Sequence, residues 1–469
     1  LLDAAERELV LRTWNDTSVE IPERSLGDLF EEQARTRPEH PAVIFNEHTL
    51  TYGQLNEQAN QLAHHLTDSG LRRGDLAGVL LERGIDFAVT LLAIVKTGAG
   101  YAVLDPDFPD ERLTTTATDA HITTLITDTA RSGRISGPWS VIQVDTERET
   151  IGRHRTDNPG LRVTPVDVAC VMFTSGSTGR PKGVLSSHHN LISTLTHQTY
   201  ATFGPTETFL QCSPVSWDAF SLEFWGALLH GGTTILQPGQ KPEPTHITHL
   251  TTHHPITMLQ LSSSLFNYLT DEHPHTFQHT HTTYTGGEPA SPTHTHQLQQ
   301  THPHLTITNG YGPAESMGFT TTHTITPTTT PPTTIPIGTP LTNKHAYILD
   351  THLQPTPIGT TGELYLAGHG LAHGYLNQPT NTATHFIPNP YGPPGTRLYR
   401  TGDTAHWTPT GQLHYTGRTD TQIKIRGFRI EPTEIETTLQ THPHITQTAI
   451  TTHTDHHNTP RLTAYITTT

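Results

Sequence analysis

Apolar residues from 26 to 105 alternate between helical spacing and short apolar blocks. In TYGQLNEQANQLAHHLTDSG, leucine and alanine recur every three or four residues, which predicts an amphipathic helix that stops at Gly70. SLGDLFEEQARTRPEH predicts an earlier helix, and FAVTLLAIVKTG a later one that ends at Gly98. Strand-like runs lie between the helices at residues 42–45, at 76–81 and in YAVLDP. This order predicts a parallel sheet covered by helices on both faces.

The rest of the chain is less regular. VDVACVMF (166–173) predicts a buried strand that leads directly into a loop. Residues 241–310 and 320–360 are so rich in Thr, His and Pro that periodicity is weak, although TMLQL and ITNGYG still predict strand ends. After residue 340, the runs AYILD, GELYLAG and QLHYTG predict an antiparallel, barrel-like segment. From about Thr433 a helix and two alternating strands are expected, and no internal repeat or coiled coil is found.

Charge and composition exclude several classes of protein. The chain has 43 acidic and 27 basic residues and a formal charge of −16, so its field repels nucleic acid and anionic membranes, and no basic patch is found. No apolar run approaches the ~20 residues of a membrane span, and no signal peptide opens the chain. Cys170 and Cys212 are too few for a disulfide framework and are typical of reduced thiols in a cytoplasmic protein. The 35 histidines are scattered without HExxH or CxxC spacing, so a histidine metal site is not expected.

The loop FTSGSTGRPKG (173–183) is the most specific chemical signal. Its glycines let backbone N–H groups approach an anion, the Ser and Thr hydroxyls add donors, and Lys182 supplies a positive charge. The loop is neither a Walker A motif, which needs Ser or Thr after the lysine, nor a dinucleotide-binding GxGxxG. A plain Gly/Ser surface turn is the alternative that composition leaves open.

TSGSTGRPKG resembles the signature loop of the adenylate-forming enzymes, which include acyl-CoA synthetases, firefly-type luciferases and the adenylation domains of nonribosomal peptide synthetases. The other signatures of that superfamily follow in order along the chain, which excludes an accidental match. They are LTYGQL, VKTGAGYAVLDP, WDAFSLEFW, NGYGPAES, GELYLAGHGLAHGYL, YRTGD and GRTDTQIKIRGFRIEPTEIE. Three features favour the peptide-synthetase branch. They are the last of these segments, the run LAHGYL and the acidic Asp218 of WDAF.

The resemblance implies an α/β fold and two domains. Residues 1–417 would form an adenylation core of two α/β subdomains plus a β-barrel-like subdomain, which binds the amino acid and ATP. Residues 418–469 would be an incomplete, mobile α+β C-terminal subdomain with its hinge at Asp420. The implied reaction is attack of an amino-acid carboxylate on the α-phosphorus of ATP, followed by transfer of the aminoacyl group to the phosphopantetheine thiol of a carrier domain.

The resemblance also assigns the nucleotide site. Thr174, Lys182, Glu315 and Lys424 would be the catalytic groups, with Glu315 as the ligand of Mg²⁺. Tyr311 would stack on adenine, Asn309 would read its edge, and Asp403 would accept the ribose hydroxyls. A turn around Asp403 and a core position for Tyr311 are the ordinary alternatives. The full implied nucleotide set is Thr174, Ser175, Gly176, Ser177, Thr178, Gly179, Lys182, Gly286, Gly287, Glu288, Asn309, Tyr311, Asp403, Tyr415 and Arg418.

The amino-acid site is carried over by matching positions. Asp218 would pair with the substrate α-ammonium, since a buried carboxylate facing a plain acid would only cost free energy; a helix-capping Asp is the alternative. Three glycines leave space and no second charge is present, so an uncharged side chain is expected, with valine first; Gln260 and Tyr284 could favour a polar or larger neutral one. The implied lining is Asp218, Ala219, Leu222, Gln260, Tyr284, Gly286, Gly310, Gly318 and Phe319.

The chain departs from the family pattern in two places. Ala314 stands where a Thr usually precedes the Mg²⁺-binding Glu, so one phosphate hydrogen bond is expected to be missing. The chain stops at YITTT, before the NGKxD-type lysine that would bridge the substrate carboxylate and ATP. We therefore expect this chain to bind ATP and amino acid but to form adenylate poorly, on the order of 10²–10³ more slowly.

Rival interpretations are a carboxylate–CoA ligase of the same superfamily and a non-catalytic docking module. Replacing Asp218 with Ala should abolish amino-acid use in an amino-acid-activating enzyme but should hardly affect a carboxylate–CoA ligase for plain acids, so this variant distinguishes the two. The expected partners are peptidyl carrier and condensation domains of a parent synthetase and, if required, a small MbtH-like protein, with neither nucleic acid nor membrane.

Overall fold

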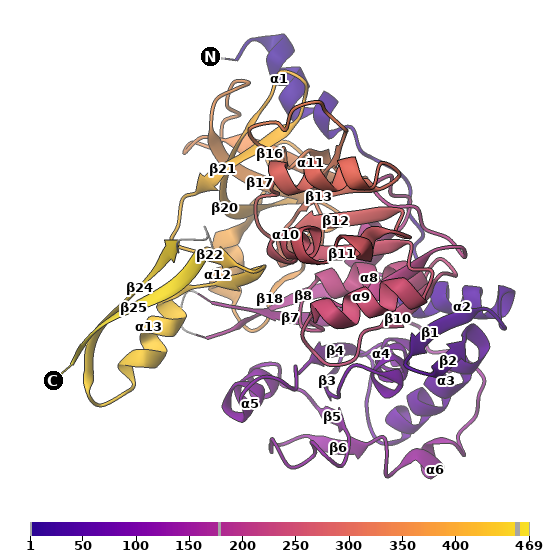
Figure 1. The fold of residues 1–469 in the computed structure, drawn as a ribbon. Coiled ribbons are helices and arrows are strands. Elements are labelled where there is room, and N and C mark those ends of the chain that lie inside the picture. The colour runs from indigo at the N-terminus through magenta and orange to yellow at the C-terminus, as the bar shows by residue number, and fades with distance from the viewer. Residues whose placement is uncertain (1, 177–179, 455–459, 469) are drawn as a thin grey trace.

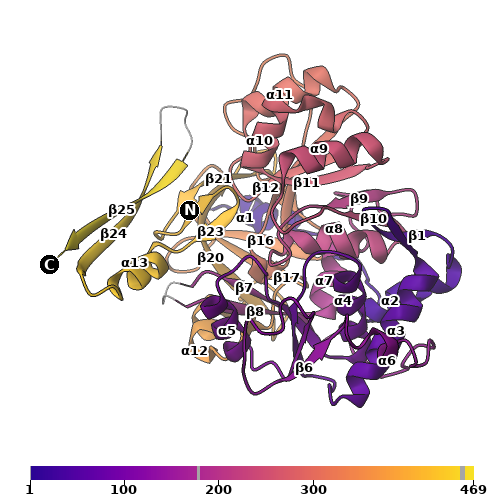
Figure 2. The same ribbon diagram turned by 60° about the horizontal axis from the view of Figure 1, so that its bottom comes forward.

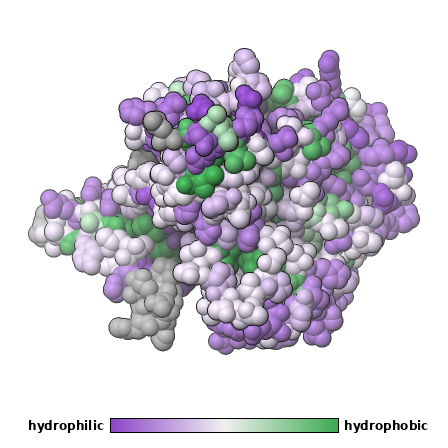
Figure 3. Space-filling view, turned by 90° about the horizontal axis from the view of Figure 1, so that it is seen from above, coloured by the Kyte–Doolittle hydropathy of each residue, from purple (hydrophilic) through white to green (hydrophobic). Residues whose placement is uncertain are grey.

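A computed structural model describes residues 2–176, 180–454 and 460–468 (Figures 1 and 2). The chain folds into layered α/β sheets, an antiparallel sheet and a C-terminal segment that lies to one side of the body in both views. On the face seen from above, polar residues predominate and apolar residues form small separate patches (Figure 3). Within the described ranges, none of the helices combines the length and apolar character needed to cross a membrane.

The first sheet has the strand order β18-β8-β7-β4-β3-β5-β6. Its pairs from β7 through β4, β3 and β5 to β6 are parallel, as the sequence predicts, while β8 and β18 add antiparallel pairs at one edge. The strands are β3 (Leu76–Leu80), β4 (Gly100–Val103), β5 (Thr124–Thr127), β6 (Ser140–Gln143), β7 (Val168–Thr174), β8 (Lys182–Ser187) and β18 (Gly374–Tyr375).

The second sheet has the order β15-β14-β13-β12-β11-β9-β10-β1-β2. It is parallel from β13 to β1 and antiparallel at both edges. The strands are β1 (Pro41–Phe45), β2 (His48–Thr51), β9 (Thr208–Gln211), β10 (Thr233–Leu236), β11 (Met258–Ser262), β12 (Thr282–Gly286), β13 (Thr306–Tyr311), β14 (Thr321–Ile325) and β15 (Thr339–Pro340).

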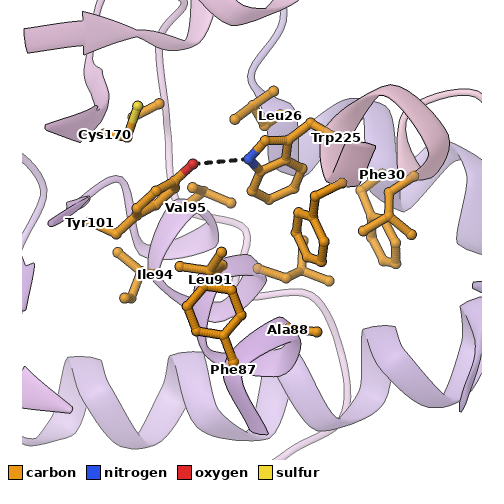
Figure 4. Close-up of a cluster of buried hydrophobic side chains, with 14 of the residues drawn as sticks. Leu26, Phe30, Phe87, Ala88, Leu91, Ile94, Val95, Tyr101, Cys170 and Trp225 are labelled. Carbon is orange, nitrogen blue, oxygen red and sulfur yellow. Dashed lines mark hydrogen bonds between the residues drawn. The ribbon is translucent and has the colours of Figure 1, made fainter. Parts of the chain in front are cut away.

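Helices pack between the two sheets and over their outer faces. Helix α4 (Ile85–Thr97) contacts strands of both sheets and is buried from Phe87 to Thr97, which explains why its sequence is apolar all round. Next to it, the Trp225 indole N–H donates to the Tyr101 hydroxyl at 3.0 Å in the shared core (Figure 4). The neighbouring helices of this layer are α2 (Leu26–Thr36), α3 (Tyr52–Asp68), α7 (His188–Leu195) and α8 (Ala219–Leu228).

The outer faces are covered by α5 (Asp110–Asp119) on the first sheet and by α9, α10 and α11 on the second. Weak periodicity in the Thr- and His-rich region left α9 (Pro244–His253), α10 (Ser263–Glu272) and α11 (Pro292–Thr301) unpredicted. They fold because a few apolar residues, including Ile247, Phe266 and Leu298, are buried against the sheet. Shorter helices are α1 (Ala4–Leu11), α6 (Arg148–Ile151), α12 (Pro379–His385), η1 (Thr13–Asn15), η2 (Pro274–Phe277) and η3 (Ala314–Ser316).

An antiparallel sheet follows residue 340, as the alternating runs predict. Its order is β16-β17-β20-β19, and β21 pairs with β20. The strands are β16 (Lys344–Leu349), β17 (Gly362–Gly368), β19 (Phe386–Pro388), β20 (Arg397–Trp407) and β21 (Leu413–Arg418).

The C-terminal segment contains two hairpins and a helix. Strands β22 (Ile423–Ile425) and β23 (Phe428–Ile430) form the first hairpin, and α13 (Pro432–Gln440) follows it. Strands β24 (Ile445–Thr454) and β25 (Pro460–Thr468) form the second hairpin, as predicted.

Candidate functional site

A cavity of about 750 Å³ opens between the large sheets and the β22–β23 hairpin. Its walls include the ends of β7, β11, β12 and β13, which is where ligands bind in parallel α/β sheets. The structure thus brings together residues that lie far apart in the chain. The implied site residues on its lining are Thr174, Ser175, Asp218, Ala219, Gln260, Gly286, Gly287, Gly310, Gly318, Phe319, Asp403, Arg418 and Lys424.

The phosphate-type loop connects β7 to the antiparallel β8, which starts at Lys182. The Thr174 hydroxyl oxygen is buried and has no hydrogen-bond partner within the described ranges. The Ser175 hydroxyl donates to the Arg429 carbonyl at 2.8 Å, and the Gly176 N–H donates to the Glu434 carboxylate at 3.3 Å. Ser177, Thr178 and Gly179 lie outside the described residues. A buried hydroxyl without a protein partner is suited to donate to an oxyanion, so Thr174 is compatible with an anionic ligand at this loop.

Lys182 and Glu315 meet beside this loop, with 3.4 Å between Nζ and Oε1. The Tyr375 hydroxyl donates to the same Oε1 at 2.8 Å, and Arg429 Nη1 lies 3.1 Å from each Glu315 oxygen. Burial alone would raise the pKa of the fully buried Glu315, but the charges of Arg429 and Lys182 hold it well below its usual range. This shift favours the ionised form of the buried Glu315 carboxylate.

Glu315 is the carboxylate that would face a divalent cation. The described residues contain no group of three or more His, Cys, Asp or Glu side chains placed to hold a metal ion. A Mg²⁺ ion at Glu315 would thus complete its shell with phosphate oxygens and water, which suits the preference of Mg²⁺ for few protein ligands. Both Glu315 oxygens are now paired with Arg429, so that arginine would have to shift.

The implied ribose site is tightly organised around Asp403. The Tyr311 hydroxyl donates to Asp403 Oδ2 at 2.6 Å, and Arg418 pairs with Oδ1. Arg418 also binds Asp420, the implied hinge residue, through two contacts of 2.7 Å. A carboxylate oxygen can accept two hydrogen bonds, and the contacts above give each Asp403 oxygen one donor. Asp403 would therefore keep acceptor capacity for ribose hydroxyls.

Other implied nucleotide residues are engaged in protein contacts. The Asn309 amide donates to the Pro336 carbonyl at 2.7 Å, and Tyr415 is half-buried against the core of the antiparallel sheet. Glu288 accepts from the Gly427 N–H at 3.2 Å and so connects the YTGGEP turn to the β22–β23 hairpin. Lys424 of the same hairpin lies 5.9 Å from the centre of the Tyr311 ring. Burial lowers the pKa of Lys424, while the charges of Asp403 and Asp218 favour its protonated form.

Asp218 caps helix α8, as the helix-capping alternative expects, and also lies on the cavity wall. Its Oδ1 accepts from the Ala219 N–H and its Oδ2 from the Gly318 N–H, both at 3.0 Å. Burial raises the pKa of the Asp218 carboxyl, and these two N–H groups oppose that shift. Capping and ligand binding are compatible, because each oxygen retains a free lone pair.

A narrow pocket continues from Asp218 into the core and is lined by Ala219, Leu222, Gln260, Gly318 and Phe319. The space that glycine was expected to leave is partly taken, because a Cβ on Gly310 would meet the Phe319 ring at 2.3 Å. Tyr284 stands behind Phe319 with its ring centre 5.8 Å away, and it donates to the Tyr200 carbonyl. The buried Gln260 Oε1 has no partner among the described residues.

Residues that sequence reasoning missed complete the site. Arg429 lies two residues after Gly427 in the signature GRTDTQIKIRGFRIEPTEIE. Its positive charge within that signature could have identified it as a site residue. Tyr375 belongs to the quoted segment ending in GYL. Tyr200 closes the narrow pocket from a segment without a motif, and Lys344 reaches the Gly318 loop from β16. No local pattern identifies these two.

Comparison with known families agrees with this geometry. A family model described as AMP-binding enzyme matches residues 30–376, which is most of the chain. The chain belongs to the AMP-binding enzyme family.

Two relatives carry the names of peptide-antibiotic synthases. A linear gramicidin synthase of Brevibacillus parabrevis is 40% identical over 468 residues, which are 99% of this chain but 9% of that protein. Tyrocidine synthase 3 of the same organism is 37% identical over 441 residues, 94% of this chain and 7% of that protein. The chain thus spans less than a tenth of the length of these two relatives.

Solved structures show the same architecture. Holo-PA1221, an NRPS protein containing adenylation and PCP domains bound to a vinylsulfonamide inhibitor, matches with a TM-score of 0.87 and 28% identity over 95% of this chain and 77% of that one. NpsA-ThdA, an artificially fused adenylation–PCP di-domain from Klebsiella oxytoca, matches with a TM-score of 0.89 and 28% identity over 96% and 90% of the two chains. The α/β fold class and the resemblance to peptide-synthetase adenylation domains are confirmed.

Proposed function

We propose that this chain selects an amino acid with an uncharged side chain and activates it with ATP to an aminoacyl-adenylate, releasing pyrophosphate. The observation that carries the proposal is one cavity in which Thr174, Asp403 and Asp218 face the same space. These three are an anion-binding loop end, a ribose-type acceptor and a buried carboxylate suited to an ammonium group.

In the proposed reaction, a substrate carboxylate oxygen attacks the α-phosphorus of ATP. The new bond joins that oxygen to phosphorus, and the bond to the bridging oxygen of pyrophosphate breaks with its electron pair on the leaving group. Thr174 and Lys182 would hold the leaving phosphates, and Glu315 would hold Mg²⁺, which supplies charge neutralisation when bound. Alignment and charge stabilisation suffice, so no protein nucleophile is required.

Asp218 would anchor the α-ammonium group of the substrate. The narrow pocket beyond it carries Leu222 and Phe319, and among its described lining residues the only charged side chain is Asp218 at its mouth. The charge of this lining therefore favours a neutral side chain, and valine remains our first choice. The unpartnered Gln260 oxygen supports a polar neutral side chain as the second choice.

Residues 1–417 would act as the binding core and residues 418–469 as a subdomain that swings at Asp420. The bond from Arg418 to Asp420 lies at this boundary. Because the solved relatives contain PCP domains, we propose a peptidyl carrier as the thiol acceptor, within a cytoplasmic synthetase that also supplies condensation domains and, if needed, an MbtH-like protein.

The test compares binding of AMP with binding of a panel of aminoacyl-sulfamoyl-adenosines, stable analogues of the adenylate. Calorimetry on Asp218→Asn should show AMP bound as before and every aminoacyl analogue weakened by about 100-fold, because a buried ion pair is lost. Asp350→Asn, in a surface turn, is the matched control. An analogue that binds Asp218→Asn as tightly as the wild type would favour a carboxylate–CoA ligase instead.

A further inference from the structure

Lys344 is a fully buried lysine, with 0% of its surface exposed, at the first residue of β16. Its side-chain nitrogen donates to three backbone carbonyls: Ser316 at 2.6 Å, Met317 at 2.9 Å and Phe319 at 2.6 Å. Three acceptors around one nitrogen match the three N–H donors of the protonated form. A buried ammonium balanced by carbonyl oxygens is costly to retain, so its position needs a reason beyond packing.

The segment that Lys344 holds is conformationally strained. Met317 has φ of +50°, in the left-handed region that a non-glycine residue adopts at a cost, and Gly318 follows with φ of +63°. Such a backbone persists only where surrounding contacts determine it. The Thr194 hydroxyl adds a 3.2 Å bond to the Met317 carbonyl, and Lys344 fixes the carbonyls on both sides of Gly318.

This strained segment carries groups of the amino-acid site. The Gly318 N–H binds Asp218 Oδ2 at 3.0 Å, and the Phe319 ring forms part of the narrow pocket. A shift of the segment would therefore change both the orientation of the carboxylate and the width of the pocket. Burial lowers the pKa of Lys344 to about 7, and the charge of Asp218 opposes that shift, so the ammonium lies within electrostatic range of the carboxylate.

Space for the Lys344 side chain depends on the absence of a side chain at Gly370. A Cβ on Gly370 would lie 2.5 Å from Lys344 Cε, 2.8 Å from Nζ and 2.8 Å from the Ser316 carbonyl oxygen. The absence of a side chain at residue 370 is thus a condition for the lysine to reach the segment.

We propose that Lys344 is a positioning residue for the amino-acid site, which acts by clamping the carbonyls of Ser316, Met317 and Phe319 so that Asp218 and Phe319 are held for the substrate. The inference rests on the proposed function and extends it to a residue outside the cavity lining. Lys344 lines neither the cavity nor the narrow pocket, so it would not contact the substrate itself.

The test measures two dissociation constants in the complete chain: one for AMP, and one for the aminoacyl-sulfamoyl-adenosine that the wild type binds best. In Lys344→Met, which keeps the length but removes the charge and the donors, the constant for the analogue should rise on the order of tenfold or more. The constant for AMP, whose proposed site is around Asp403, should stay within about twofold. Selectivity among neutral aminoacyl analogues should also fall, since the pocket wall loosens.

The matched control is Lys96→Met. Lys96 is another buried lysine, paired with Glu31 between α4 and α2, and neither residue lines the cavity or the narrow pocket. A purely structural lysine would lower the folded fraction, and so the number of binding sites, without changing the ratio of the two constants. Should Lys344→Met fail to fold, Gly370→Ala displaces the clamp without removing the lysine, and the same selective loss is expected.

The outcomes separate the two claims. A wild type that binds AMP but none of the aminoacyl analogues would overturn the proposed function, and this inference with it. A wild type that binds an analogue, together with folded Lys344→Met or Gly370→Ala variants that bind it unchanged, would overturn the positioning role alone.

Discussion

Asp403 shows how buried polar groups at this site are prepared for a ligand. Its two oxygens are fixed by Tyr311 and by Arg418, and it is almost completely buried. Burial raises the pKa of Tyr311 well above its usual value, so its hydroxyl stays protonated and remains a donor to Asp403. A carboxylate held in this way has its orientation set before a ligand binds, which would lower the ordering cost of binding the proposed ribose.

Replacing Asp403 with Asn should weaken AMP binding by about tenfold to a hundredfold. The amide keeps the shape but lacks the charge, so Arg418 faces a neutral group and the ribose hydroxyls lose a charged acceptor. Calorimetric titration with AMP measures the effect. Glu363→Gln, which removes the partner of Arg400 on the adjoining strand β17, is the control and should bind AMP normally. Equal affinities for Asp403→Asn and wild type would place the ribose elsewhere.

At the scale of elements, helix α8 connects the proposed amino-acid site to the core. Asp218 caps its first turn, while Glu223, further along the helix, binds the last residue of β9 and the loop after it. The Glu223 carboxylate accepts from the Ser213 hydroxyl at 2.7 Å and from Gln211 at 3.0 Å. Burial raises the pKa of Glu223 to about 7, although those donors oppose the shift. The helix is therefore anchored by an acid that is protonated below about pH 7.

This anchor makes stability depend on pH with a definite sign. The pKa of Glu223 is raised from 4.5 to about 7, so its contribution to stability is fully present below pH 4.5 and is lost as the pH rises through 7. The difference in unfolding free energy between wild type and Glu223→Gln should therefore fall over this window, by at most about 1.4 kcal/mol per pH unit. Urea denaturation at several pH values measures it. Glu57→Gln, on the exposed face of α3, controls for the change from acid to amide. A pH-independent difference for Glu223→Gln would be incompatible with a buried acid that titrates near 7.

At the scale of the molecule, the C-terminal segment forms part of the cavity wall and is held to the body by a few specific contacts. Arg429 reaches Glu315, the Gly427 N–H reaches Glu288, and the Phe428 ring packs edge-on against Trp217 with ring centres 4.8 Å apart. The main charged contact in this set is to the carboxylate that would hold Mg²⁺. Docking of the hairpin and binding of Mg²⁺ at the proposed position would therefore compete for the same two oxygens.

Removing this contact should loosen the C-terminal segment without unfolding the core. In Arg429→Met, backbone amides of residues 421–436 should exchange hydrogen faster, because Glu315 no longer holds the hairpin. Amides of the buried helix α4 should exchange at the wild-type rate. Hydrogen exchange followed by mass spectrometry measures both, with Arg400→Met, which breaks the Arg400–Glu363 pair, as the control for loss of an arginine–glutamate pair elsewhere. Unchanged protection of residues 421–436 in Arg429→Met would show that the ion pair does not hold the segment.

The sequence predicted the elements whose own pattern is strong. Helices α3 and α4 follow the spacing of leucine and alanine, and α4 ends at Gly98, where φ is +79°. The glycine-rich loop indicated a candidate anion site because close backbone approach needs residues without side chains. Helices α9, α10 and α11 were missed because their buried apolar residues are too few to form a pattern among Thr and His.

By itself, the sequence determined the α/β layers, the family and about a third of the residues that line the cavity, since these depend on local periodicity and on motifs that span a few residues. Only the tertiary structure decided what each group meets. Phe319 fills the space beside Gly310, Arg429 occupies the Glu315 carboxylate, and Lys344 reaches the Gly318 loop from strand β16. The physical reason is that a side chain's pKa, partners and free space are set by atoms brought together by folding, and the spacing of residues along the chain does not encode those distances.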